Sequence, residues 1–292
     1  MIPRLHILGA GRTARTLARL WHDAGVVRIG QVRNRGLDSA REAVGWIGQG
    51  EAVDDFEPFA PDDWLLIGVP DSAIARCTQR GLPRSALAFH LSGAEPASLL
   101  DGSADSTASV HPVCAFADPD LARRQFPGRF AVGEGDPAAL DRLLPCFEAI
   151  GARTLRFAPS DKRLYHAAMI AASNFLCTLD QLAEDLAVAG GLGAPEARRL
   201  IASLQSGALD TISERGATVA LTGPIERGDA ATCEAMLDRI RARAEHDETF
   251  AAQVLPLFAL LAGSTVDLAK RKHPARVDAL NALRTLFEER AA

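Results

Sequence analysis

The sequence of 292 residues lacks the marks of a disulfide-bonded, metal-binding or membrane-spanning protein. Its five cysteines are scattered, odd in number and never spaced as C-x-x-C, which argues against a disulfide framework or a zinc site. It has no uninterrupted run of 18 apolar residues and no charged leader with a cleavage site. We therefore expect reduced thiols, no metal, no membrane partner and a cytoplasmic protein.

An excess of positive charge is also missing. The 32 basic and 37 acidic residues leave a net charge of −5, so no nucleic-acid partner is expected. There is neither a repeat of fixed period nor a low-complexity segment. With 48% hydrophobic and 24% charged residues, the composition is that of a globular chain long enough for two domains.

Strand-like and helix-like segments alternate over the first half of the chain. The stretch from Asp63 to Pro70 is a continuous apolar run that ends in proline, which is typical of a strand buried on both faces of a parallel sheet. We expect Asp71 and Ser72 to cap a helix that begins at Ala73. The other expected strands cover 5–8, 26–33, 52–53, 86–91, 108–110, 129–132 and 154–157, with helices at 37–44 and 137–150. This order predicts a doubly wound α/β domain over residues 1–157, with ligands at the carboxyl ends of its strands.

Strand signals are absent after residue 157. Alanine- and leucine-rich helical patterns cover 162–189, 195–214, 230–244, 249–262 and 277–289. They predict an all-α domain over residues 158–292. The stretch 169–189 is apolar around its whole circumference, so we expect it to be buried on most sides and expect a homodimer through the helical domain.

A glycine motif joins the first strand to the first helix. It reads G-x-G-x-x-A and consists of Gly9, Ala10, Gly11, Arg12, Thr13 and Ala14. In such a motif the first glycine permits a tight turn, the second lets phosphate approach the backbone, and the small third residue keeps the helix close to the strand. The motif predicts a site for a dinucleotide pyrophosphate at the helix N-terminus.

The acidic residue that would bind the ribose hydroxyls of NAD is missing after the second strand. Arg33, Asn34 and Arg35 stand there instead. Guanidinium groups suit a 2′-phosphate, so we predict NADP(H) as the cofactor; a solvated arginine pair is the alternative. The missing acid also argues against a methyltransferase that binds S-adenosylmethionine. Further contacts to the cofactor are predicted from Val69, Pro70 and Ser92.

Several ordered motifs resemble one family. They are the glycine motif, Val69-Pro70-Asp71, His90-Leu91-Ser92-Gly93-Ala94, Ser109-Val110-His111-Pro112, Lys162-x-x-Tyr165-His166-Ala167-Ala168 with Ser173-Asn174, and Leu221-Thr222-Gly223-Pro224-Ile225-x-Arg227-Gly228-Asp229. Over nearly its whole length the chain resembles Rossmann-like proteins with a DUF2520 helical domain. These belong to the broad group of enzymes similar to 6-phosphogluconate dehydrogenase and pyrroline-5-carboxylate reductase. The resemblance implies an NADP oxidoreductase.

The segment from Lys162 to Asn174 offers candidates for proton transfer. At about 100° per residue, Lys162, His166 and Ser173 fall within roughly 40° of one another on one helical face. We predict that His166 is the general acid or base and that Asn174 orients the substrate. In the related β-hydroxyacid dehydrogenases a Lys and an Asn lie one turn apart, a spacing that Lys162 and Asn174 do not match. A structural histidine at the domain junction is the alternative for His166.

His111 is the second candidate for the general acid or base. Its place in a His-Pro pair at a strand end resembles the prephenate dehydrogenases, in which a histidine near the nicotinamide assists hydride transfer; the alternative is a turn histidine. Ser92 and Gly93 are predicted to bind substrate or the nicotinamide amide. Ser92 is equally suited to cap a helix over 95–100.

The segment 222–229 is polar and rich in turn residues. Its position resembles the substrate loop of pyrroline-5-carboxylate reductases, which implies that Thr222 and Arg227 contact the substrate, with Arg227 clamping a carboxylate. The alternative is a plain turn in which Asp229 caps the next helix. We interpret the basic run 270–273 as a solvated helix end without a function.

The sequence thus predicts an NADP(H)-dependent oxidoreductase that acts on a small polar, carboxylate-bearing molecule at the cleft between the domains. The alternative is a non-catalytic NADP-binding regulatory or scaffold protein. A deazaflavin-dependent reductase ranks third.

Overall fold

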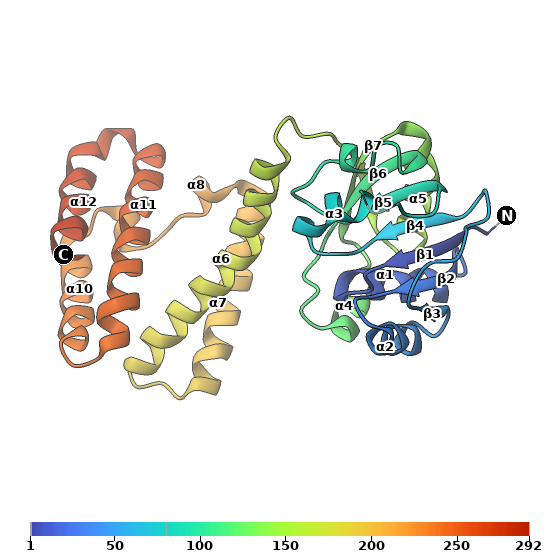
Figure 1. The fold of residues 1–292 in the computed structure, drawn as a ribbon. Coiled ribbons are helices and arrows are strands. Elements are labelled where there is room, and N and C mark those ends of the chain that lie inside the picture. The colour runs from blue at the N-terminus through green and yellow to red at the C-terminus, as the bar shows by residue number, and fades with distance from the viewer. Residues whose placement is uncertain (1, 80, 292) are drawn as a thin grey trace. The chain divides into compact units, whose positions relative to one another are not determined.

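The computed structural model describes residues 2–79 and 81–291, and Figure 1 shows their fold. The chain divides into two compact units, Met1–Ser173 and Asn174–Ala292. The division falls within the long helix α6 (Lys162–Ala189), so the predicted boundary at 157/158 lies inside the first unit. The first turns of α6 belong to this unit because their polar side chains bond to its sheet.

The first unit contains an eight-stranded sheet in the order β3-β2-β1-β4-β5-β6-β7-β8. The strands are β1 Arg4–Leu8, β2 Arg28–Arg33, β3 Glu51–Val53, β4 Trp64–Ile67, β5 Ser85–His90, β6 Ala104–Val113, β7 Phe130–Gly135 and β8 Arg153–Arg156. Every pair is parallel except β6 and β7. The strand order reverses between β1 and β4, which is where doubly wound sheets bind ligands.

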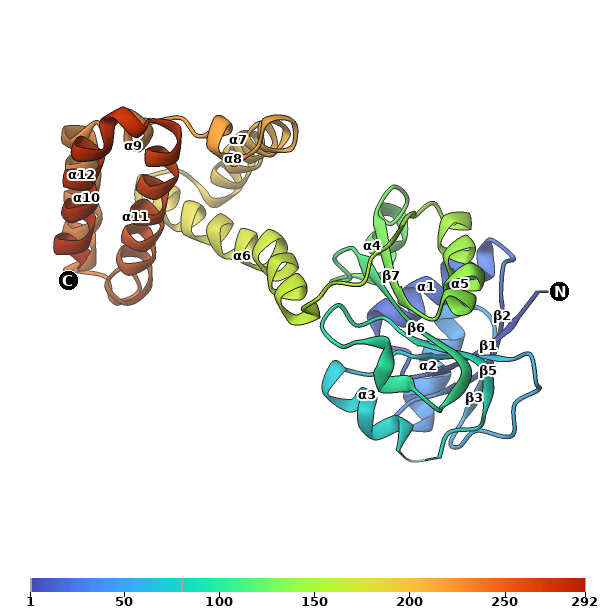
Figure 2. The same ribbon diagram turned by 90° about the horizontal axis from the view of Figure 1, so that it is seen from above.

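Helices cover both faces of this sheet (Figure 2). They are α1 Arg12–Asp23, α2 Leu37–Ile47, α3 Asp71–Thr78, α4 Pro119–Gln125, α5 Pro137–Ala149 and the 3₁₀ helix η1 Ala97–Leu100. Trp64 and Leu66 of β4 face the core with α1 and α5, whereas Leu65 and Ile67 pack toward α3 and η1. The strand is therefore buried on both faces, as its continuous apolar run predicts.

One local prediction is wrong. Helix α3 begins at Asp71 and not at Ala73, because Pro70 occupies the cap position and Asp71 already lies in the first turn, where its charge suits the helix dipole. Strand β7 runs antiparallel to β6, because the chain returns through the short α4 without crossing the sheet.

The second unit is all helical. Besides the rest of α6 it contains α7 Ala194–Arg215, α8 Ala217–Ala220, α9 Pro224–Arg227, α10 Ala230–Ala244, the π-helical η2 Phe250–Val254, α11 Leu255–Lys272, the 3₁₀ helix η3 Pro274–Arg276 and α12 Val277–Ala291. Helices α10, α11 and α12 enclose a core around Leu237, Val266 and Phe287. The fourth predicted helix, over 249–262, was too short, since α11 continues to Lys272.

Two of these helices carry large apolar surfaces. Among the described residues, only Phe250–Lys272 is long and apolar enough to cross a membrane, which a partly buried core helix also satisfies. Val266 and Ala269 of this helix lie in the core of the unit. In α6 only Leu182 is buried, whereas Phe175 is 63% exposed, so the predicted burial of 169–189 on most sides is wrong for a single chain.

Candidate functional site

The turn after β1 can only be made with glycine. Gly9 has φ +86°, and a Cβ there would lie 2.8 Å from Val69 Cγ1 and 2.9 Å from the Val69 backbone nitrogen. On the other side of this contact, a Cβ on Gly68 would lie 2.4 Å from the Gly9 carbonyl oxygen. The turns after β1 and β4 thus pack backbone against backbone at the point where the strand order reverses.

Gly11, by contrast, has room beside it. It is the N-cap of α1, and a Cβ there would meet only the Gly68 carbonyl oxygen, at 4.0 Å. Within the described part of the chain no side chain caps this end of α1. The first N–H groups of the helix, from Arg12 to Ala14, therefore remain available to an anion. Ala14 itself is buried against the turn after β4.

The residues after β2 have separate tasks. Asn34 accepts a hydrogen bond from the Ala10 nitrogen (2.7 Å) and donates one to the Ser39 carbonyl (2.8 Å), which ties the glycine turn to α2. Arg33 donates to the Asp54 carbonyl and pairs with Asp55 at 3.0 Å. Arg35 is exposed and has no partner among the described residues. The structure therefore separates the two arginines that the sequence treats as a pair.

A largely buried ion pair lies beside the middle of β6. The antiparallel register places Ser109 opposite Glu134 of β7. The Lys162 ammonium donates to the Ser109 hydroxyl and to the Glu134 carboxylate, the latter at 2.9 Å, and both charged side chains are at most 15% exposed. Burial lowers the pKa of Lys162 from its ordinary value, while Glu134 acts in the opposite direction. Glu134 also accepts from the Ala97 nitrogen, so the pair is fixed to η1.

His111 and Tyr165 form a hydrogen-bonded pair beside this cluster. The Tyr165 hydroxyl lies 3.0 Å from His111 Nδ1, and the rings meet edge to face. Burial lowers the pKa of His111 to about 4, and the neighbouring His166 and Lys162 act in the same direction. Burial also raises the pKa of Tyr165. Both groups are consequently neutral near pH 7.

His166 approaches the same point as His111. A Cβ on Gly93 would lie 2.5 Å from His166 Nδ1 and 2.9 Å from His111 Nε2. His166 Nδ1 is buried, and no described residue bonds to it. Two imidazole nitrogens therefore converge on the backbone of Gly93, and any side chain there would displace them.

Ser92 holds the loop that carries Gly93. Its hydroxyl accepts hydrogen bonds from the Ala94 and Glu95 nitrogens, and its carbonyl accepts one from Ser109. The Ser92 nitrogen donates to His90 Nδ1, and the pKa of His90 is lowered to about 4 by burial. The prediction that Ser92 caps a helix over 95–100 is wrong: η1 begins at Ala97 with Pro96 at its cap position and without a side-chain cap, so Ser92 closes the bend before it.

The first unit therefore brings together Ser92, Gly93, His111, Lys162 and His166. Ser173 ends this unit, and its hydroxyl donates to the Met169 carbonyl. Asn174, Thr222 and Arg227 belong to the second unit, and their roles stay predictions.

In the second unit the segment 222–229 is held by the end of α11. The Glu226 carboxylate bonds to His273 Nε2, and Lys272 lies 3.3 Å from the same oxygen while donating to the Leu221 carbonyl. The interpretation of 270–273 as a solvated helix end is wrong for Lys272 and His273, because both side chains contact Glu226 in the segment 222–229. Asp229 accepts from the Thr232 nitrogen, which confirms the expected cap of α10.

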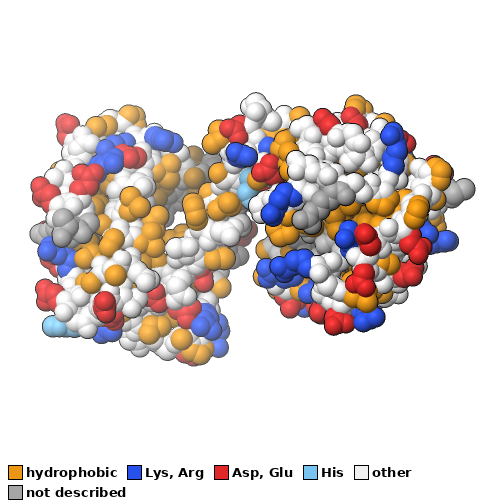
Figure 3. All heavy atoms as spheres, in the orientation of Figure 1, with side chains coloured by type: hydrophobic (Ala, Val, Ile, Leu, Met, Phe, Trp, Pro, Cys, Tyr) orange, Lys and Arg blue, Asp and Glu red, His pale blue; other side chains and the backbone are white. Residues whose placement is uncertain are grey.

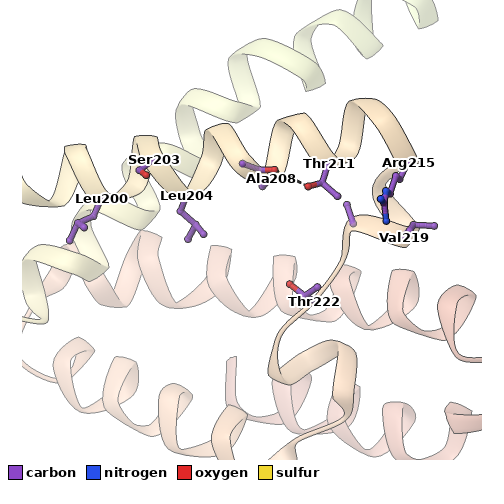
Figure 4. Close-up of a pocket in the computed structure, with 10 residues that line it drawn as sticks. Leu200, Ser203, Leu204, Ala208, Thr211, Arg215, Val219 and Thr222 are labelled. Atoms are coloured by element: carbon purple, nitrogen blue, oxygen red, sulfur yellow. Dashed lines mark hydrogen bonds between the residues drawn. The ribbon is translucent and has the colours of Figure 1, made fainter.

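An open groove of about 700 Å³ also lies in the second unit (Figure 4). Leu200 and Leu204 reach into it from α7, and Val219 of α8 and Thr222 complete its wall. The groove holds none of the histidines, so it is not the candidate catalytic site.

Sequence reasoning missed Glu134 and Tyr165 as parts of the site. Glu134 was hidden because the direction of β7 determines which residue lies beside Ser109. Tyr165 left a signal, since it is the single tyrosine of the chain and stands three residues after Lys162.

Comparisons with known proteins establish the class of fold, and one family model matches part of the chain. The chain shares its fold with protein TM1727 of Thermotoga maritima, at 26% identity and a TM-score of 0.69, over 91% of this chain and 99% of that one. It also shares its fold with BF3122 of Bacteroides fragilis, named as a candidate NADP oxidoreductase (21% identity, TM-score 0.71, 90% and 97% covered), and with an imine reductase of a Pseudomonas species (16%, 0.62, 92% and 98%).

The fold class predicted from the sequence, a Rossmann sheet followed by an all-α part, is thus confirmed. The model of DUF2520, a domain of unknown function, matches residues 130–265. The resemblance to this family that the sequence predicts is thus confirmed. The match begins at β7 and so includes Glu134, Lys162, Tyr165 and His166. No curated protein matches the sequence.

Proposed function

We propose that the protein is an NADP(H)-dependent oxidoreductase acting on a small polar substrate. The observation that carries the proposal is the glycine turn between β1 and α1. Gly9 has no room for a side chain, whereas Gly11 has open space beside the uncapped N-terminus of α1, at the reversal of strand order. A pyrophosphate fits there, with hydrogen bonds from the first turn of the helix. The name of the Bacteroides relative supports the same cofactor.

Arg35 is the residue that we assign to the 2′-phosphate. Arg33 is already bound to Asp54 and Asp55, and the carboxylate of Asp55 would repel a phosphate. Arg35 keeps its guanidinium free of the described residues. Asn34 fixes the backbone on which Arg35 stands. We expect Val69, Pro70 and Ser92 to line the rest of the cofactor site.

When bound, a nicotinamide supplies or accepts the hydride. The protein must hold the substrate and manage one proton. His111 Nε2 and His166 Nδ1 converge at Gly93, so a substrate oxygen or nitrogen held against that backbone could reach either of them. Glu134 balances the charge of Lys162. Lys162 also bonds to Ser109, which holds the Ser92 carbonyl, so we assign it a structural role beside a role in ligand binding. Ser173, Asn174, Thr222 and Arg227 stay candidates for holding a polar, carboxylate-bearing substrate.

Binding of NADPH tests the cofactor assignment. All three tryptophans lie in the first unit, so their fluorescence reports on this unit. We expect NADPH to quench it and to raise the melting temperature by a few degrees, with a weaker effect of NADH. Arg35→Ala should weaken NADPH binding about 10- to 100-fold, which corresponds to the loss of a charge-assisted hydrogen bond. Arg33→Ala should have a smaller effect.

A second variant blocks the pyrophosphate. Gly11→Val places a side chain in open space, so the protein should fold but lose NADPH. Gly45→Val, at a helical position with no neighbour within 4 Å, is the control. Equal binding of NADPH by the wild type and the Gly11 variant would refute the site. A screen of keto acids, imines and hydroxy acids for NADPH turnover then separates an enzyme from a scaffold.

We also propose a homodimer through the helical unit. Apolar side chains lie open on its surface (Figure 3), among them Leu204 at 77%, Leu260 at 68% and Phe175 at 63% exposure. A unit that exposes several large apolar side chains is suited to a protein–protein contact. Sedimentation velocity should show a dimer that Leu204→Glu weakens, whereas Leu121→Glu on the first unit should leave it intact. A wild-type monomer at micromolar concentration would refute the dimer.

A further inference from the structure

The hydrogen bond between His111 and Tyr165 has no role in the proposed function, and neither histidine candidate explains it. It joins β6 to the first turn of α6 within the first unit, where the DUF2520 match covers Tyr165. Tyr165 is partly exposed, so its hydroxyl can exchange protons with water. His111 is more deeply placed, with Nε2 turned toward Gly93.

The direction of this hydrogen bond follows from the acidity of its two partners. A phenol is a far stronger acid than the N–H of a neutral imidazole, and an imidazole nitrogen is a good acceptor. The favoured arrangement has the Tyr165 hydroxyl donating to Nδ1. The proton of the neutral ring must then lie on Nε2, the nitrogen that approaches Gly93.

The structure assigns Tyr165 as the positioning residue of His111: its hydroxyl holds the ring as the Nε2–H tautomer and replaces the proton that His111 gives to the substrate. This inference rests on the proposed function, in which the nicotinamide is the reductant. The substrate carbon gains a hydride while its oxygen or nitrogen gains a proton. For that proton the Nε2–H bond breaks, while the O–H bond of Tyr165 breaks and its proton forms a bond to Nδ1. The phenolate then takes up a proton from the solvent, which is the net proton source, and proton exchange with the solvent returns the ring to the Nε2–H tautomer.

The surroundings of His111 favour such a relay over an imidazolium donor. Lys162 and His166 on α6 oppose a positive charge on the ring, and Asp71 at the start of α3 only partly offsets them. Burial leaves the pKa of His111 near 4, so little imidazolium exists at pH 7. A neutral ring can give up its Nε2 proton at low cost only if Nδ1 receives another. Tyr165 is the one described residue bonded to that atom.

The tautomer can be measured in the protein without cofactor or substrate. In ¹⁵N spectra of ring-labelled protein, assigned with His111→Gln, we expect a protonated Nε2 and an unprotonated Nδ1. Tyr165→Phe keeps the aromatic ring but removes the donor, so the two nitrogen signals should move toward an average of both tautomers. Leu164→Ala, an exposed neighbour on the same turn, should leave them unchanged.

Because the chain has one tyrosine, its ultraviolet titration reports on Tyr165 alone. A hydroxyl that donates to His111 is stabilised in its neutral form, so His111→Gln should lower the pKa of Tyr165. In turnover, Tyr165→Phe should lower kcat about 100-fold with little change in the KM for NADPH.

A proton found on Nδ1 of His111 in the wild type would overturn the inference, as would nitrogen signals that Tyr165→Phe does not move. Failure of NADPH binding would instead refute the proposed function and would leave the measured tautomer standing.

Discussion

The absence of a side chain at Gly93 determines the positions of two histidine rings at this site. The Gly93 backbone is the meeting point of His111 and His166, and a Cβ would lie 2.5 Å from His166 Nδ1. Real Cβ atoms do not approach a nitrogen that closely, so one ring would have to move. The loop itself is held by Ser92 and would stay in place. Gly93 therefore matters for the position of the rings more than for the fold.

We predict that Gly93→Ala lowers turnover about 100-fold, the effect of a misplacement near 1 Å. The melting temperature should fall by only a few degrees, and NADPH affinity should change little. Circular dichroism and the fluorescence titration measure the last two quantities. Gly45→Ala is the control, because its Cβ would meet nothing within 4 Å. Unchanged turnover in the Gly93 variant would remove both histidines from the reaction.

At the scale of elements, the sequence predicts the parts whose periodicity is strong. Helix α6 has the predicted bounds, Lys162–Ala189, and so does α10, Ala230–Ala244. The antiparallel direction of β7 was not predicted, because it depends on the path of the chain through α4 and a strand pattern does not encode that path. This direction places Glu134 beside Lys162, so Glu134 could not be predicted as part of the site from the sequence.

The contacts of the loop 222–229 could not be predicted from the sequence for a similar reason. Its motif indicated contacts with substrate, but nothing in the sequence pairs Glu226 with residues nearly fifty positions later. The structure does so through Lys272 and His273 at the end of α11. Hydrogen bonding to His273 lowers the pKa of Glu226, so the carboxylate remains ionised in mildly acidic solution.

We predict that Glu226→Gln loosens this loop. Backbone amides of residues 221–229 should exchange hydrogen faster, because the loop loses its charged contact with the end of α11. Amides in β4 and β5 of the first unit should keep their rates. Glu214→Gln on the exposed surface of α7 is the matched control. Identical exchange in the Glu226 variant and the wild type would show that Lys272, through the Leu221 carbonyl, holds the loop alone.

At the scale of the whole molecule, the first unit carries several buried histidines. Burial lowers the pKa of His6, against the opposing effect of Asp63, and lowers those of His90 and His111 to about 4. In the unfolded chain these groups have pKa values near 6.5. As the pH falls below that value, the unfolded state binds protons that the folded state refuses.

The free energy of unfolding of the first unit should therefore decrease as the pH falls from 6.5 toward 4, and not above 7. Each fully effective histidine contributes a slope of about 1.4 kcal/mol per pH unit. Urea unfolding followed by tryptophan fluorescence between pH 7 and pH 5 measures this slope, above the range in which carboxylates titrate. His90→Gln should reduce the slope, because the replacement does not titrate. His22→Gln, at a half-buried position of α1 in the same unit, should leave the slope unchanged. If both variants kept the wild-type slope, protonation of His90 would not be what destabilises the sheet.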